Sequence, residues 1–582
     1  MSALDELRGK IGIVVESYCR DYPNRIKHSR KDEKLFRDPI FGFQRLRPYE
    51  VLLVDTPIFQ RLRGIFQTAL AYLTYPSSVH TRFEHSVNAM NLASRILTEL
   101  MSRGVYVEKQ EEAEVRIAAL LHDIGHCVFS HGSEFYYREL PEISEASQDP
   151  KFSQCHPSEG EIINYCILTS KQFKDLVWDP IKKAFEGQED FNYLNNVEIE
   201  QVAEIIIGAA PEGKANKRYL TDIVNGPIDV DKLDYLRRDG YFTGVAFSVD
   251  IDRLLPSLRV SKVKNKELGR DEQRLVVDYR GISVVEQLLF ARMLLYDTVY
   301  HHHKVRAANS LLQKMLRAHA HRDVWPTTTK RLDTISNLLQ IDEYEFFGNK
   351  YADVSIQADV DRLRRRILPE RALVIAPRAL CDRGSHTIWA HRFAQITNRS
   401  DPEGVKKGKK YFDEVRNLAV MYAREAGAKS IGIDDITIDI PEPPEYDSLG
   451  RETLIQIAAQ YCIPLMKFFP FQKAVNNYSE QYKYRSYVFA PEEYRKHVAY
   501  AAFRAFKEKG IELNDLALIW AHQETDTKHL FAKFDIEPKE WTKDYYEPTP
   551  TEAELDIRAQ LRKSPTAVQR EIYDILKLQF GE

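Results

Sequence analysis

A histidine–aspartate doublet at the end of an apolar segment constrains this chain more than any other feature of its sequence. His122 and Asp123 directly follow the apolar residues 117–121, which have helical spacing. This places two side chains that bind metal ions at the edge of a hydrophobic core. His85 upstream and Asp231 downstream complete a set of two imidazoles and two carboxylates, which suits a hard or borderline divalent cation. We therefore expect the chemistry of the chain at this set.

Two other interpretations of the segment weigh less. A single buried histidine is usually a hydrogen-bonded core residue, but six of the 17 histidines lie between residues 80 and 156, in an apolar helical frame. His122 and His126 also match the H-x-x-x-H spacing of zinc proteases. There, however, an aspartate stands where a glutamate must act as the general base, and Gly125 weakens the helix that the motif needs. The protease interpretation would also leave the other two members of the set unexplained.

Length and composition indicate a folded protein of several domains. A chain of 582 residues is too long for one ordinary core, and 43% hydrophobic with 11% aromatic residues is typical of a folded chain. The net charge of −4 does not favour nucleic acid as the main partner. The six cysteines form no C-x-x-C pair, the N-terminus lacks an apolar signal segment, and no run of about 18 apolar residues would span a membrane. We expect reduced thiols, a cytoplasmic location and no membrane partner.

The spacing of apolar residues predicts a mainly α fold, with a multi-helical core, a small β hairpin and a C-terminal mixed α+β lobe. Alternating residues at 257–278 predict the hairpin, a long helix is expected over 281–316, and a β-rich run at 434–440 lies in the lobe. We expect four parts: an N-terminal helix and connector at 1–48, the helical core at 49–325, the C-terminal lobe at 326–546 and a helical tail at 547–582.

The segment after Asn225-Gly-Pro227 predicts a helix with one polar face. At about 100° per residue, Asp231, Lys232, Tyr235 and Asp239 fall within one arc of roughly 100°. A charged helix face is usually just solvated, but this one follows a Gly-Pro break and two apolar residues. We therefore interpret the face as the wall of a polar pocket.

Four motifs follow one another along the chain. They are Asp55-Thr-Pro-Ile-Phe-Gln-Arg-Leu-Arg63, His80-Thr-Arg-Phe-Glu-His85-Ser, His122-Asp-Ile-Gly-His126-Cys-Val-Phe-Ser-His131 and Ile228-Asp-Val-Asp231-Lys-Leu-Asp-Tyr235. In this order they resemble the HD-domain phosphohydrolases, and more closely the deoxynucleoside triphosphate triphosphohydrolases, including members that carry an N-terminal SAM domain. The resemblance covers about residues 45–320. No SAM domain is expected before it, because residues 1–48 are too few.

The resemblance implies four sets of functional residues. The metal ion, which could be Fe, Mn, Mg or Zn, would be held by His85, His122, Asp123 and Asp231. The reacting centre would be lined by His126, His131, Glu134 and His156. The nucleoside triphosphate would be bound by Gln67, Arg82, Lys232, Tyr235, Asp239, Arg292 and Tyr300, with Gln67 and Asp239 at the sugar 3′-hydroxyl. An activating nucleotide would be bound by Asp55, Gln60 and Arg63.

The implied reaction is hydrolysis of a (deoxy)nucleoside triphosphate to a nucleoside and inorganic triphosphate, by attack of a metal-activated water at the α-phosphorus. A metal ion lowers the pKa of bound water toward neutrality and neutralises phosphoryl charge. Arginine and lysine side chains bind the phosphate oxygens as negative charge builds. A histidine that a carboxylate orients can protonate the leaving oxygen at neutral pH, and His131 with Glu134 fits this role.

Three positions depart from the family pattern. Pro157 follows His156 where a relative has an acidic residue, which weakens the role expected of His156. Thr68 stands beside Gln67 where an apolar residue blocks a ribose 2′-hydroxyl, which leaves the selection of deoxynucleotides open. The consecutive histidines 301–303 shift the lysine that follows them by one place.

Two other functions stay open from the sequence. One keeps the metal site but changes the substrate, as in a phosphodiesterase or nuclease that acts on cyclic nucleotides or single-stranded nucleic acid. The other is a non-catalytic nucleotide sensor, which the loss of a metal ligand would favour, but all four candidate ligands are present. The resemblance also implies a homo-oligomer, a dimer or tetramer, under allosteric control. The tail from Thr551 could bind a partner or nucleic acid, although a packing helix is the simpler interpretation.

Overall fold

The computed structural model describes residues 2–29, 32–211, 213–214, 216–247, 249–265, 269–320, 334–351, 354–397, 401–441, 452–458, 461–468 and 485–523. They belong to two compact units, Met1–Leu368 with Arg451–Pro464, and Pro369–Gly450 with Leu465–Glu582. The described chain is mainly helical with small sheets, which confirms the predicted fold class. The predicted boundary at residue 325 and the predicted tail at 547–582 lie outside the described residues.

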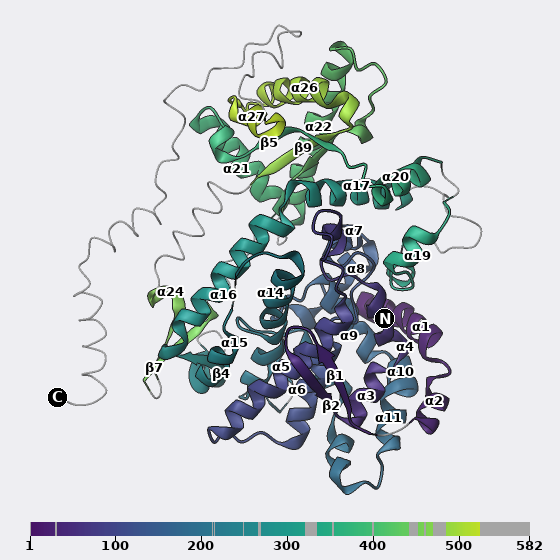
Figure 1. Ribbon diagram of the computed structural model, residues 1–582, viewed down its shortest axis with the longest axis vertical. Coiled ribbons are helices and arrows are strands. Elements are labelled where there is room, and N and C mark those ends of the chain that lie inside the picture. Colours follow the sequence, from purple (N-terminus) through teal and green to yellow (C-terminus); the bar gives the residue numbers. More distant parts are fainter. Residues whose placement is uncertain are drawn as a thin grey trace, which may run out of the picture. The chain divides into compact units, whose positions relative to one another are not determined.

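Three helices at the centre of the first unit carry the candidate metal ligands (Figure 1). Helix α5 (Arg82–Ser102) packs against α6 (Lys109–Leu121) and α14 (Val230–Thr243). Met90, Ile96 and Leu97 of α5 are fully buried, as expected for a helix enclosed by neighbours. Helices α9 (Glu159–Thr169), α12 (Ile199–Ile206) and α13 (Tyr219–Val224) surround this centre. None of the helices in the described parts is both long enough and apolar enough to cross a lipid bilayer.

Caps decide where two of these helices begin. The Glu84 carboxylate accepts a hydrogen bond from the backbone N of Thr81 at 2.7 Å, which starts α5 at Arg82. The Asp229 carboxylate accepts from the backbone N of Lys232 at 2.8 Å, which starts α14 at Val230. The cap of α5 places His85 in the first turn of that helix, and the cap of α14 places Asp231 in its first turn.

The N-terminal region holds more regular structure than the sequence indicated. Helices α1 (Ala3–Cys19) and α2 (Tyr22–His28) are followed by strands β1 (Lys34–Asp38) and β2 (Gly42–Leu46), which pair antiparallel. We expected a polar connector here, and that expectation was wrong for the hairpin. Charged side chains in the two strands obscure the alternation of polar and apolar residues that would predict them. Gly42, with φ 76°, allows the tight turn between the strands.

The predicted hairpin at 257–278 is present as β3 (Leu258–Asn265) and β4 (Arg270–Asp278). It belongs to a four-stranded sheet of order β3-β4-β7-β8, because β7 (Leu454–Ala458) pairs parallel with β4 and antiparallel with β8 (Tyr461–Pro464). The two returning strands are distant in sequence, so no local pattern indicated them.

The long helix expected at 281–316 is divided. It consists of α16 (Ile282–Leu295), a π-helical turn η8 (Tyr296–Tyr300) and α17 (His303–Ala320). Three shorter helices follow in the same unit: α18 (Ile335–Leu338), α19 (Glu343–Gly348) and α20 (Val354–Arg364). A π turn inside a helix often accompanies a functional site.

The second unit has the mixed α+β class that the sequence predicted for a C-terminal lobe. Its antiparallel sheet has the order β5-β9-β6, formed by β5 (Glu370–Ile375), β9 (Ser486–Ala490) and β6 (Thr437–Asp439). Helices α21 (Arg383–Thr397), α22 (Pro402–Glu425), α26 (Arg495–Glu508) and α27 (Leu516–His522) share one apolar core with the sheet. This core lets the unit bury its own apolar surface.

Candidate active site

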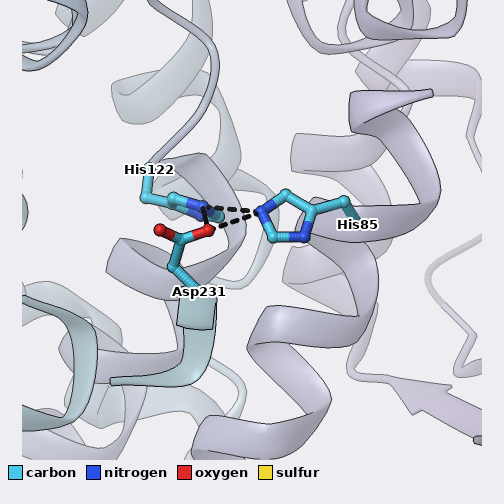
Figure 2. Close-up of side chains that lie close together, drawn as sticks. All are labelled: His85, His122 and Asp231. Atoms are coloured by element: carbon cyan, nitrogen blue, oxygen red, sulfur yellow. Dashed lines mark hydrogen bonds and ion pairs between the residues drawn. The ribbon is translucent and has the colours of Figure 1, made fainter. Parts of the chain in front are cut away.

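His85, His122 and Asp231 converge from three helices (Figure 2). His85 Nε2 lies 3.1 Å from Asp231 Oδ1 and 3.2 Å from His122 Nε2. One ligand atom of each residue lies within 4.8 Å of the other two. Two imidazole nitrogens and a carboxylate oxygen at this spacing could hold a divalent ion. These are three of the four ligands that the resemblance implies.

Further hydrogen bonds orient both imidazole rings for a metal ion. His85 Nδ1 lies 2.6 Å from Asp234 Oδ2, and His122 Nδ1 lies 2.8 Å from the carbonyl oxygen of Ala119. With Nδ1–H as the donor to these acceptors, each Nε2 presents its lone pair to the centre of the group. Metal-binding histidines are usually held in this way. The residues present therefore fit a metal ion.

Asp234 is a functional candidate that the sequence interpretation missed. Its carboxylate is fully buried and also accepts hydrogen bonds from Asn88 and Arg238. Burial would raise the pKa of Asp234, but the charge of Arg238 and the bond from His85 lower it to about 2. Its position one helical turn after Asp231 was the available signal, since residues three apart share a helix face.

The charges around His85 favour a cation between the two rings. Burial alone would lower the pKa of His85, but hydrogen bonds to Asp231 and Asp234 raise it to about 10. Burial would raise the pKa of Asp231, yet the bonds from His122 and His85 hold it well below its ordinary value. A metal ion bound here must displace protons, so its affinity rises with pH.

Asp123, the fourth implied ligand, lies beside this group. Its Oδ2 accepts a hydrogen bond from Arg82 Nη1 at 2.7 Å and lies 3.5 Å from His85 Nε2. Its Oδ1 lies 3.6 Å from His122 Nε2. Despite burial, the charges of Arg82 and the neighbouring histidines hold the pKa of Asp123 well below its ordinary value. Its carboxylate thus joins both rings of the metal group to a buried arginine.

A second group of titratable side chains adjoins the first. It consists of His126, His131 and Glu134. His131 Nδ1 lies 3.0 Å from Glu134 Oε1, and His126 Nε2 lies 3.2 Å from Asp123 Oδ1, so the two groups are linked. Burial and the charge of Arg82 lower the pKa of His126 to about 4. The surrounding protein disfavours a charged His131 ring, but the charge of Glu134 outweighs this and raises the pKa of His131.

Close packing holds the loop that connects these groups. A Cβ at position 125 would clash with the backbone of Gly160 and Asn164, which explains the glycine in this motif. The Asn164 side chain donates to the carbonyl oxygens of Leu121 and His122, the end of α6. Arg61, which the sequence interpretation did not select, donates through Nη2 to two further carbonyl oxygens of the loop, at 2.7 Å each.

Several implied substrate residues line the polar face of α14. Lys232 donates to the Asp229 carboxylate and, at 3.0 Å, to the Gly226 carbonyl oxygen. Tyr235 lies close enough to the charge of Arg292 that this charge lowers its pKa, although burial raises it well above its ordinary value overall. Within the described residues, buried Arg292 Nε and Nη1 have no hydrogen-bond partner. Unpaired buried cationic donors suit a bound anion.

Asp239 is the centre of a hydrogen-bonded cluster. Its Oδ1 lies 2.8 Å from His80 Nε2, and its Oδ2 accepts from the Tyr300 hydroxyl. The His80 ring stacks on Phe242 with centroids 4.6 Å apart. The backbone N of Gln67 donates to the His80 carbonyl oxygen at 3.0 Å, so both implied sugar-binding residues adjoin His80.

The remaining implied residues have other surroundings. His156 is exposed, has φ 44° and belongs to neither of the two metal-capable groups among the described residues. Of the implied regulatory set, Gln60 Oε1 accepts from Arg63 Nε at 2.8 Å, while Asp55 pairs with Lys34 at 3.2 Å on the surface. The structure thus brings Gln60 and Arg63 together and leaves the Asp55 carboxylate in a separate ion pair.

Comparison with known proteins supports this interpretation. Residues 82–160 match the family described as HD domain, and residues 249–396 match the HD associated region. The chain is 32% identical over 282 residues to an uncharacterised protein of Methanocaldococcus jannaschii, across 48% of this chain and 49% of that protein. It is 29% identical over 329 residues to the deoxynucleoside triphosphate triphosphohydrolase SAMHD1 of Danio rerio, across 54% of this chain and 49% of that protein. The matched stretch thus spans about half the length of these relatives.

A solved structure shows the same fold. A phosphohydrolase of Bacteroides thetaiotaomicron superposes with a TM-score of 0.53 at 22% identity, and the alignment covers 79% of this chain and 100% of that one. At this identity the likeness bears on the fold alone. The HD domain match lies within the first unit, which contains both groups of titratable side chains.

Proposed function

We propose that this chain, which matches the HD domain over residues 82–160 and resembles the deoxynucleoside triphosphate triphosphohydrolases, hydrolyses (deoxy)nucleoside triphosphates to nucleoside and inorganic triphosphate. The observation that carries the proposal is the joining of two groups by one carboxylate. Asp123 lies within 3.6 Å of the His122 ring and 3.2 Å of the His126 ring. A site for a cation thereby adjoins His126, which belongs to the same group as the candidate proton donor His131.

The metal ion would be held by His85, His122, Asp123 and Asp231. A divalent ion there supplies positive charge for the phosphoryl oxygens and lowers the pKa of a coordinated water. The protein contributes rigid ligands, because each ring is fixed through its other nitrogen and each ligand lies at the end of a helix or in its first turn. Such preorganisation reduces the reorganisation that the reaction requires.

The triphosphate would lie along buried cations. Arg292 has two unpaired buried donor atoms among the described residues, and Lys232 is held by Asp229 at the start of α14. Arg82 has one further buried donor, Nη2, without a hydrogen-bond partner in the described part. These donors would neutralise the charge that builds on the phosphate oxygens.

His131 would protonate the leaving oxygen. Glu134 orients its ring through Nδ1 at 3.0 Å, which leaves Nε2 as the proton donor. Because the charge of Glu134 raises the pKa of His131, the ring carries its proton at higher pH than an unpaired histidine. An exposed side chain can exchange the proton with water between turnovers, and that of His131 is 68% exposed.

The sugar would be bound at Asp239 and Gln67. Gln67 Oε1 is buried and has no hydrogen-bond partner in the described part of the chain, so a sugar hydroxyl could satisfy it. The Thr68 hydroxyl already bonds to that of Ser78 at 2.8 Å. We further propose that Asp55, Gln60 and Arg63 bind an activating nucleotide and that the protein works as a homo-oligomer.

The test is a product analysis. The protein is incubated with Fe, Mn, Mg or Zn ions and with each deoxy- and ribonucleoside triphosphate in turn, with and without added GTP, and the products are separated chromatographically. Nucleoside plus inorganic triphosphate is expected, and the ratio of deoxy to ribo turnover measures the effect of Thr68. Nucleotide binding without turnover would instead indicate a sensor. Cleavage of only cyclic or polymeric substrates would indicate a phosphodiesterase or nuclease.

A further inference from the structure

Glu343 joins two loops of the candidate site from a distant part of the chain. It is the first residue of α19, it is 1% exposed, and its Oε1 accepts hydrogen bonds from two backbone amides. These are the N–H groups of Phe66 at 3.1 Å and Phe129 at 3.0 Å. A buried carboxyl rarely bridges two loops by chance, because burial of a polar group costs free energy unless its bonds compensate.

One of the two amides lies next to a residue of the proposed reaction, and the other lies next to a residue that binds Arg82. Phe66 precedes Gln67, and Phe129 precedes Ser130. The Ser130 hydroxyl donates to the Phe66 carbonyl oxygen and accepts from Arg82 Nε, both at 2.8 Å. Glu343 thus holds together the two loops that Ser130 connects. Ser130 in turn binds Arg82, which donates to Asp123.

The backbone at this junction is strained. Phe129 and Ser130 have positive φ values of 63° and 45°, which residues with a Cβ rarely adopt. Such a conformation persists only where several neighbouring contacts hold it. The Glu343 hydrogen bond is one of these contacts, and the rings of Phe346 and Phe347 pack on Phe129 with centroids 4.8 and 5.8 Å apart.

The same helix also packs closely on the first loop. The ring of Tyr344 contacts that of Phe66 at a centroid distance of 5.8 Å. A Cβ at Gly64 would clash with the side chain of Asp342, which caps α19 by accepting from the backbone N of Glu345 at 2.8 Å. The start of α19 and residues 64–66 therefore have little freedom to move apart.

We propose that Glu343 is a positioning residue, whose carboxyl holds the Phe66 and Phe129 amides together and thereby fixes Ser130 and Arg82 at the active site. The role in catalysis rests on the function proposed above, whereas the clamp on the two loops does not. Glu343 does not contact the substrate in this proposal. It acts by positioning the backbone of the two loops, which carry or bind the residues that contact the substrate.

Two substitutions and one control test the proposal. Glu343→Gln keeps the Oε1 acceptor, so we expect kcat within about threefold of the wild type. Glu343→Ala removes it, and kcat should fall by about 100-fold with KM changed far less, because small displacements of catalytic groups cost about that much. Glu345→Ala removes an exposed carboxyl of the same helix and should leave both constants unchanged.

Amide hydrogen exchange separates this proposal from the proposed function. Faster exchange at the Phe66 and Phe129 amides is expected in Glu343→Ala and not in Glu343→Gln, even if no nucleotide is hydrolysed. Unchanged exchange at both amides in Glu343→Ala, or a kcat within threefold of the wild type, would overturn the proposal. If Glu343→Ala does not fold, Glu343→Asp serves instead, since its shorter side chain cannot reach both amides without movement. Hydrogen exchange at the two amides and kcat are then measured on Glu343→Asp, and the same outcomes support or overturn the proposal.

Discussion

The two groups of histidines and carboxylates in the first unit are chemically alike but differ in their surroundings. The metal group is built around an enclosed ring: the His85 side chain is 0% exposed and is fixed by Asp234, while the Asp231 side chain is 37% exposed. In the second group, the His131 side chain is 68% exposed and is held by Glu134 from the same short helix, α7 (His131–Tyr137). An ion site needs ligands fixed in a water-poor setting, whereas a proton donor must regain its proton from water. The difference in exposure is the one that the proposed functions, an ion site and a proton donor, require.

Removal of a metal ligand should have the largest effect. For His85→Ala we expect loss of bound metal and a fall in activity on the order of 10³-fold, since metal ions contribute several kcal/mol of transition-state stabilisation. Elemental analysis of the purified protein and product assays measure the two quantities. Wild-type metal content with wild-type turnover would remove His85 from the ligand set.

Loss of the second group should leave the metal in place. For His131→Ala we expect kcat to fall by about 10²- to 10⁴-fold, the usual contribution of a general acid, with metal content unchanged. Turnover within a few-fold of the wild type would show that another group protonates the leaving oxygen. Loss of metal from this variant would show that the two groups form a single unit.

Weakening the support of the metal group should have a smaller effect that added metal reverses. For Asp234→Asn we expect about 10- to 100-fold weaker metal affinity, as for other residues that orient a ligand histidine. Metal titration followed by activity measures it. Asp252→Asn is a suitable control, because the Asp252 side chain is 71% exposed. Equal metal affinity in the two variants would contradict the role of Asp234.

The smallest effect concerns stability and pH at Glu343. Burial and the charge of Asp342 raise the pKa of Glu343 to about 8, although the two backbone amides oppose this. A carboxyl whose pKa is raised on folding stabilises the protein fully below the ordinary carboxyl pKa and loses this contribution as pH rises through about 8.

The melting temperature should therefore fall by a few degrees between pH 6 and pH 9, and fall less in Glu343→Gln, which resembles the neutral acid. Thermal unfolding of both proteins across this range measures the difference. Parallel curves would show that Glu343 does not titrate in this interval.

Much of the metal site followed from sequence because its motifs are local. His122 and Asp123 are adjacent, and Asp231 lies in the first turn of a helix that follows a Gly-Pro break. The resemblance implied that Glu134 accompanies His131, and the two side chains lie 3.0 Å apart. The catalytic and ligand roles themselves stay predictions.

Residues that act from a distance were not accessible to this reasoning. Glu343 lies 214 residues from Phe129, and Arg61 reaches the carbonyl oxygen of His126 across 65 residues. The exposure of His156 could not be predicted either, because it depends on a backbone with φ 44° between two helical turns.

The amino-acid sequence by itself determined the helical class of the first unit and the β3–β4 hairpin, and it singled out the candidate metal ligands, because periodicity and motif spacing act over a few residues. Only the tertiary structure decided which carboxylates orient the rings, which cations are buried without partners, and that β7 returns to pair with β4. These features depend on contacts between residues far apart in the chain. Such contacts form only when the whole core packs, so no local pattern records them.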